Sequence, residues 1–127
     1  MSLDSKGGKV IPNYWYDFLE KNKIVGEIRV INKEHDLSGV GIKMKFLSLR
    51  GALTITLNRH PARFLANFGY VPIGLCMYGS GDDYYINKND GKNGRLYRIY
   101  YDGVNNKLIN DGAIDRVFNN YESILLK

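Results

Sequence analysis

The residues best suited to chemistry in this sequence are one cysteine, Cys76, and two histidines, His35 and His60. A catalytic cysteine needs a base such as imidazole to form its thiolate. Cys76, however, lies between Leu75 and Met77 in an apolar stretch, where a small buried thiol is the usual finding. The three residues also lack the close spacing of zinc ligands. The sequence therefore predicts no catalytic residue, no metal site and no cofactor, and thus not an enzyme.

A second candidate is the glycine-rich segment Gly79-Ser80-Gly81-Asp82-Asp83. A phosphate-binding loop carries Gly-Lys-Ser/Thr and opens a helix, whereas a strand is expected here and two carboxylates would repel phosphate. Adjacent strand residues point to opposite faces, so Asp82 and Asp83 do not form a catalytic pair of acids. We interpret the segment as a tight turn between two strands.

The net charge of +5 is concentrated in one segment. Residues 37–81, which we call the acid-free segment, contain no Asp or Glu, and the rest of the chain is neutral. The segment holds five cations: Lys43, Lys45, Arg50, Arg59 and Arg63. These cations either attract an acidic protein or a phosphate backbone, or are ordinary solvent-exposed charges on the polar faces of strands and loops.

Tyrosines are concentrated on two predicted neighbouring strands, at Tyr84, Tyr85, Tyr97, Tyr100 and Tyr101. Because side chains alternate along a strand, Tyr84 and Tyr85 face opposite ways, as do Tyr100 and Tyr101. Some of these rings should remain partly exposed, and we take Tyr84 and Tyr100 as candidates for a partner surface. Strand propensity explains the cluster equally well.

Two amphipathic helices are predicted to flank the strands. Near the N-terminus, Trp15, Phe18 and Leu19 recur at helical spacing after Pro12, which predicts a helix over residues 14–22. Near the C-terminus, apolar residues from Ile114 to Leu125 also have helical spacing, which predicts a helix capped by Asn110 or Asp111.

Alternation predicts strands over residues 27–31, 42–46, 53–57, 70–78, 83–87 and 95–101, with a hairpin turn at 48–51. Pro72 restricts its strand to an edge, an end or a bulge. Residues 59–68 are ambiguous, because Pro61 permits a helical turn only if the turn starts there. We expect one α+β domain over residues 1–127, with a mainly antiparallel twisted sheet, helices packed on one face, and flexible residues 1–9.

The location predicted from the sequence is cytoplasmic. No run of about 18 apolar residues is present, and residues 1–9 are polar, unlike an export signal. A single cysteine fits a reducing compartment. A membrane partner is therefore not expected.

A series of short motifs, taken in order, resembles the SMI1/KNR4 (SUKH) superfamily. The resemblance is closest from Tyr70 to the end, and residues 32–68, which include much of the acid-free segment, have no clear counterpart. The motifs are Ile11-Pro12, Phe18-Leu19 with Asn22, Tyr70-Val71-Pro72-Ile73-Gly74, Gly79-Ser80-Gly81-Asp82, Tyr84-Tyr85-Ile86-Asn87, the stretch from Gly94 to Asp102, and the stretch from Phe118 to Leu125.

The resemblance implies an α+β fold and a role without catalysis. Bacterial members of this superfamily resemble immunity proteins that neutralise the toxin domains of polymorphic or contact-dependent systems, and fungal relatives regulate cell-wall synthesis through protein contacts. Gly79 and Gly81 would supply turn positions, Asp82 would hydrogen-bond that turn, and Pro72 would mark a strand entry. The positions carried over are mostly structural: Pro12, Phe18, Leu19, Pro72, Gly79, Gly81, Asp82, Tyr85, Tyr97 and Asp102.

Our leading hypothesis is a bacterial immunity-type protein that binds a toxin domain. Its candidate surface comprises Lys43, Lys45, Arg50, Arg59, Arg63, Tyr84 and Tyr100, and an acidic partner is the charge complement. One alternative is a small nucleic-acid-binding domain that uses the acid-free segment and stacking tyrosines. Another is a regulatory scaffold of the cell-wall-synthesis type. Nucleic acid is the less favoured partner, because five cations are few for a nucleic-acid footprint.

Overall fold

The fold is a six-stranded antiparallel sheet in which each strand pairs with the next one along the chain. It was obtained as a computed structural model that describes residues 10–105 and 107–126. Residues 1–9, predicted to be flexible, lie outside the described residues. The strands are β1 (Ile28–Ile31), β2 (Ile42–Phe46), β3 (Tyr70–Cys76), β4 (Tyr84–Asn87), β5 (Leu96–Ile99) and β6 (Ile114–Phe118).

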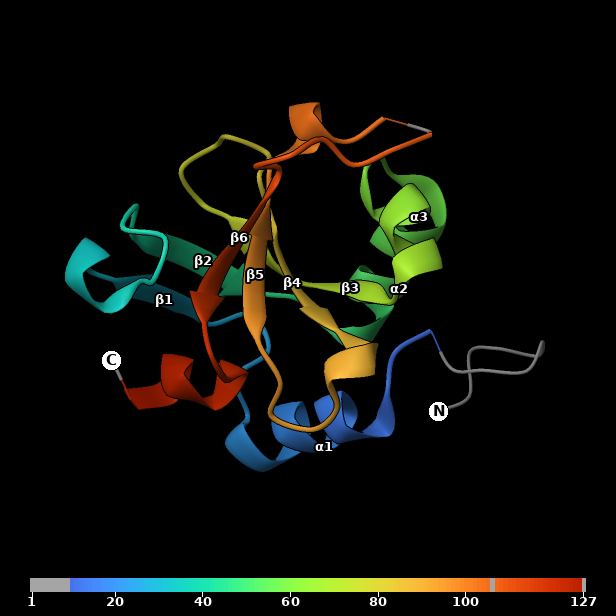
Figure 1. The fold of residues 1–127 in the computed structure, drawn as a ribbon. Coiled ribbons are helices and arrows are strands. Elements are labelled where there is room, and N and C mark those ends of the chain that lie inside the picture. Colours follow the sequence, from blue (N-terminus) through green and yellow to red (C-terminus); the bar gives the residue numbers. More distant parts are fainter. Residues whose placement is uncertain (1–9, 106, 127) are drawn as a thin grey trace.

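In the part of the chain that the structure describes, three α-helices and five short 3₁₀ helices connect and cover the strands (Figure 1). They are α1 (Asn13–Asn22), η1 (Lys33–His35), α2 (Leu49–Asn58), α3 (Ala62–Leu65), η2 (Ala66–Phe68), η3 (Lys88–Asp90), η4 (Tyr101–Gly103) and η5 (Tyr121–Leu126). The predicted N-terminal helix is confirmed as α1, which buries Trp15, Phe18 and Leu19 and is followed by the C-cap Lys23 in the left-handed conformation.

Both faces of the sheet carry a hydrophobic core. On the inner face, Met44, Tyr84 and Leu96 pack with Trp15 of α1 and Tyr121 of η5. The outer face packs Tyr85 and Ile99 with Ile55 of α2 and Leu65 of α3. The α+β prediction is therefore confirmed, but the expectation of helices on one face is wrong. Figure 1 shows α1 and η5 together below the sheet, and α2 with α3 at its right side.

The strand predicted over residues 53–57 is instead part of α2. Its alternating Leu and β-branched residues also fit a helical face, on which Ala52, Ile55 and Thr56 are buried. Ser48, predicted to begin a hairpin turn, is the N-cap, and its Oγ accepts a hydrogen bond from the Gly51 amide at 3.0 Å. Burial and capping thus override strand propensity. Residues 59–68 take the helical alternative, with α3 beginning directly after Pro61.

The predicted C-terminal helix is also wrong. Residues 114–118 form β6, which pairs with β5, and a separate helix, η5, begins at Tyr121. The Asn120 side chain starts the new element, because its Oδ1 accepts hydrogen bonds from the amide and hydroxyl of Ser123. Asn110 and Asp111 therefore cap no helix; the Asn110 carbonyl accepts from the Ala113 amide in a turn before β6.

Pro72 lies within a central strand rather than at its entry. The β3–β4 register shifts between Pro72 and Gly74, so the bulge is the alternative that the structure takes. At Gly74 the backbone approaches the buried side chain of Met44 so closely that an added Cβ would collide with it. The bulge thus accommodates both Pro72, which has no amide hydrogen to donate, and Gly74, which has no side chain to collide with Met44.

A buried arginine on β5 holds the loop between β1 and β2 against the sheet. Arg98 is only 3% exposed, and its guanidinium donates to the Gly41 carbonyl at 2.6 Å, to Ser38 Oγ at 2.7 Å and to the Asp36 carboxylate at 3.2 Å. Asp36 also accepts from the Ser38 and Gly41 amides. The Leu37 amide donates to the Val117 carbonyl of β6 at 2.9 Å. These contacts link the two ends of the curled sheet.

We expect Arg98→Met to lower the free energy of unfolding by about 3–5 kcal/mol, because it leaves the Asp36 carboxylate buried without its countercharge. Arg95→Met is the matched control, since Arg95 is largely exposed and pairs with Asp90 at 3.4 Å; its cost should be about 0–1 kcal/mol. Urea denaturation measures both. Equal losses for the two variants would contradict the structural role given to Arg98.

Candidate interaction surface

The cysteine and the two histidines lie in separate parts of the fold. Cys76 ends β3, and its Sγ accepts a hydrogen bond from Ser80 Oγ at 3.2 Å. His60 Nε2 lies 3.2 Å from the Tyr101 carbonyl oxygen, and His35 is exposed in η1. Within residues 10–105 and 107–126, no three His, Cys, Asp or Glu side chains gather as potential metal ligands.

The glycine-rich segment is the predicted turn between two strands, β3 and β4. Gly79 and Gly81 have φ angles of +82° and +80°, a region that favours glycine. Ser80 Oγ accepts from the Asp82 amide at 3.1 Å, and the Asp82 carboxylate accepts from the Tyr101 amide at 3.0 Å. Asp82 therefore ties this turn to η4, where its neighbour Asp102 is exposed.

Asp83 is the most perturbed carboxylate in this turn. Burial raises its pKa above the ordinary 3.8, and nearby Asp82 adds to the rise, whereas a hydrogen bond from the Cys76 amide and the charge of Arg59 act to lower it. The carboxylate lines an open hollow together with Arg59, His60 and Tyr101. Because Asp83 accepts a hydrogen bond from the backbone of its own turn, we assign it to the structure of that turn rather than to a binding site.

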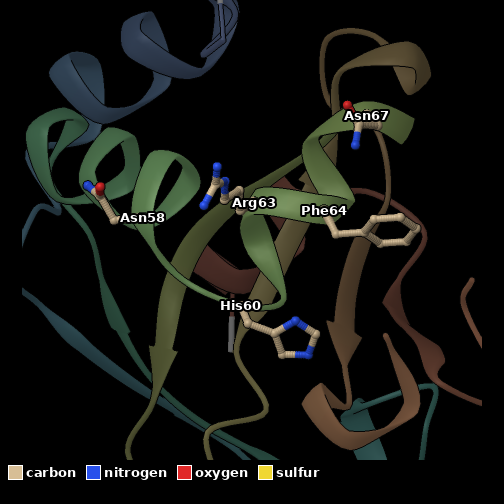
Figure 2. A pocket seen from close by; sticks show the side chains of 5 residues that line it. All are labelled: Asn58, His60, Arg63, Phe64 and Asn67. Carbon is tan, nitrogen blue, oxygen red and sulfur yellow. The ribbon is translucent and has the colours of Figure 1, made fainter. Parts of the chain in front are cut away.

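A larger hollow of about 650 Å³ lies beside the end of α2 and α3. It is lined by Asn58, His60, Arg63, Phe64 and Asn67. Figure 2 shows the Arg63 guanidinium turned toward Asn58, whereas His60 and Phe64 point the other way. Their polar atoms do not converge on one point, so the hollow does not form a site for one small charged group.

The five cations of the acid-free segment fall in three places. Arg59 and Arg63 border the two hollows, and Arg50 is exposed at the start of α2. Lys43 and Lys45 lie two residues apart on β2, so both project from the outer face of the sheet. The helices α2 and α3 pack over β3 and its neighbours, and β1 extends away from them in Figure 1.

Strand register surrounds the two lysines with apolar side chains. Ile28, Lys45 and Leu75 form one row across β1, β2 and β3. Val30 pairs with Lys43, whose carbonyl accepts from the Met77 amide at 2.7 Å, which gives a second row. Paired residues of antiparallel strands share a face. We call these six residues the lysine patch: Ile28, Val30, Lys43, Lys45, Leu75 and Met77.

The lysine patch exposes apolar side chains on the outer face of the sheet, at its β1 end. Val30 is 60% exposed, Ile28 47% and Met77 39%, and Lys45 is also exposed. Sequence reasoning identified the lysines but missed Ile28 and Val30. Their alternation with Arg29 and Ile31 was visible in the predicted strand, but which face would lack a covering helix depends on tertiary packing.

The tyrosines contribute less surface than the sequence predicts. Tyr84 is 0% exposed, so its assignment to a partner surface is wrong, and Tyr85 is buried on the opposite face. Both are buried because the two faces each have a core. Tyr100 is half-buried and its hydroxyl donates to Asp115 at 2.6 Å. The Tyr97 hydroxyl donates to Asp90, and burial is the main cause that raises its pKa to about 12.

Comparison with protein-family models, curated proteins and solved structures finds no match to this chain. Among the residues that the structure describes, no helix is long and apolar enough to span a bilayer.

The raised pKa of Asp83 predicts a pH-dependent stability difference. The folded chain binds this proton more tightly than the unfolded chain, so the contribution of Asp83 to stability falls as pH rises from 3.8 through its folded pKa. Relative to wild type, Asp83→Asn should therefore gain stability between about pH 3.5 and pH 7. Urea denaturation across this range is the measurement, with Asp111→Asn as an exposed control. If the difference in the free energy of unfolding between Asp83→Asn and wild type does not change with pH, the raised pKa of Asp83 is refuted.

Proposed function

We propose that this chain is a protein-binding module of the immunity type, which neutralises a toxin domain by covering part of its surface. The observation that supports this proposal is the lysine patch, in which exposed Ile28 and Val30 flank two cations. Apolar side chains exposed together on one sheet face are typical of sites that contact another protein. No chemical step is required of the chain.

Charge favours an acidic partner surface. Lys43 and Lys45 belong to the acid-free segment, so the sequence on either side of them adds no negative charge. Lysines at an interface accelerate association with an oppositely charged partner and disfavour a basic one. We therefore expect the toxin domain to present acidic side chains beside apolar ones.

The ordered motifs that resemble the SMI1/KNR4 superfamily are consistent with a shared scaffold. Phe18 and Leu19 lie in the core, and Gly79 and Gly81 shape a turn. None of the six residues of the lysine patch lies in one of these motifs, and Lys43 and Lys45 fall within residues 32–68, which have no clear counterpart. The nucleic-acid alternative loses support, because Tyr84 and Tyr85 are buried and offer no stacking face.

Co-expression with the toxin domain encoded by a neighbouring gene tests the proposal. The wild-type chain should restore growth and bind the purified toxin domain. The double variant Lys43→Glu, Lys45→Glu should weaken binding by at least about tenfold, because it places like charges opposite the acidic surface. Lys88→Glu with Lys92→Glu, two exposed lysines near η3, is the control of equal charge and should protect normally.

Absence of both growth protection and binding by the wild-type chain would refute the proposed function. Normal binding by the Lys43→Glu, Lys45→Glu variant would move the interface away from the lysine patch.

A further inference from the structure

Strand β1 lies at one end of the sheet and has one edge without a neighbouring strand among the described residues. The Phe46 amide donates to the Glu27 carbonyl at 3.0 Å. This bond shows which residue pairs of the β1–β2 ladder are hydrogen-bonded and which are not. Bonded and non-bonded pairs alternate in an antiparallel ladder, so Arg29 and Ile31 bond to β2. The amide and carbonyl groups of Ile28 and Val30 therefore point away from β2, toward the open edge.

Within Ile28–Ile31, this edge has no lysine or proline to block pairing. Natural edge strands are commonly blocked by lysine, proline, a bulge or a covering loop. The outer-face side chains of β1 are the exposed Ile28 and Val30, and its charged residue, Arg29, pairs with Glu27 at 2.7 Å. At the other end of the sheet, the Val117 carbonyl of β6 already accepts a hydrogen bond from the Leu37 amide. The β1 edge thus presents outward backbone groups to a further strand, whereas one carbonyl of β6 is already occupied.

We infer that β1 accepts an extended acidic segment of the partner as an additional strand, in which every second side chain lies on the outer face next to Ile28 and Val30. This inference rests on the proposed function, since the segment belongs to the protein that the chain neutralises. The added backbone would supply hydrogen bonds to the outward-pointing amide and carbonyl groups of Ile28 and Val30.

Lys43 and Lys45 determine the charge of that segment. They lie on β2, two strand spacings or about 10 Å from the added strand. A lysine stem can lie along an apolar surface while its ammonium group remains in water, here across Val30 and Ile28. The ammonium groups then meet Glu side chains that alternate along the added strand. Pairing of two β1 edges from two copies of the chain would instead add two more lysines to the same sheet face.

The probe is a synthetic peptide, acetyl-Thr-Glu-Val-Glu-Val-Glu-Thr-amide, added to the ¹⁵N-labelled full chain. The amide resonances of Ile28 and Val30 should shift and become protected from exchange. An isomer with its three Glu residues consecutive should bind at least about tenfold more weakly. Lack of binding, or shifts confined to residues outside β1 and β2, would overturn the inference, as would a β1-mediated dimer of the free chain.

Backbone variants separate the edge from the face. Val30→Pro removes an outward amide without breaking the β1–β2 ladder and should weaken peptide binding by about tenfold, whereas Val30→Thr keeps the amide and should bind within about twofold. Ile28→Pro provides a second test, and circular dichroism verifies folding. If the toxin domain binds but both proline variants bind it normally, the strand addition is wrong and the proposed function survives. If the peptide binds and the toxin domain does not, only the proposed function fails.

Discussion

The shape of this molecule depends on the hydrogen bonds made by the buried guanidinium of Arg98. It lies on β5 but bonds to Asp36, Ser38 and Gly41 in the loop between β1 and β2. A charge at this depth is tolerated only because a carboxylate, a hydroxyl and a carbonyl satisfy it together. The loop in turn bonds to β6 through the Leu37 amide. The sheet is therefore curled with its ends linked, and its inner face is sealed around Tyr84 and Trp15.

This closure decides which side chains remain for binding. Once the inner face is filled by α1 and η5, and the outer face of the central strands by α2 and α3, the outer face of β1 and β2 carries the exposed apolar rows. The same two strands carry Lys43 and Lys45. The inner side chains of β2, Ile42 and Met44, thus lie in the core, whereas the outer side chains of β1 and β2 are those that we propose contact the partner.

Local patterns predicted the elements that also satisfy their own tertiary packing. α1, β2 and the turn at Gly79 and Gly81 follow from helical spacing, alternation and glycine positions. The predictions for residues 53–57 and 114–125 were wrong because the apolar spacing of both segments fits a helix as well as a strand. The cap at Ser48 makes the first segment part of α2, and pairing with β5 makes residues 114–118 a strand. Exposure at Ile28 and burial at Tyr84 depend on which helix covers which face, and no single segment encodes that information.

The most direct test of the central claim, that the outer face of β1 and β2 contacts the partner, is zero-length carbodiimide cross-linking of the complex with the toxin domain, followed by mass spectrometry. This reagent joins a lysine amine to a carboxylate only where the two groups touch. We predict cross-links from Lys43 and Lys45 to acidic residues of the toxin domain. Cross-links from Lys88, Lys92 or Lys107, with none from Lys43 or Lys45, would contradict it.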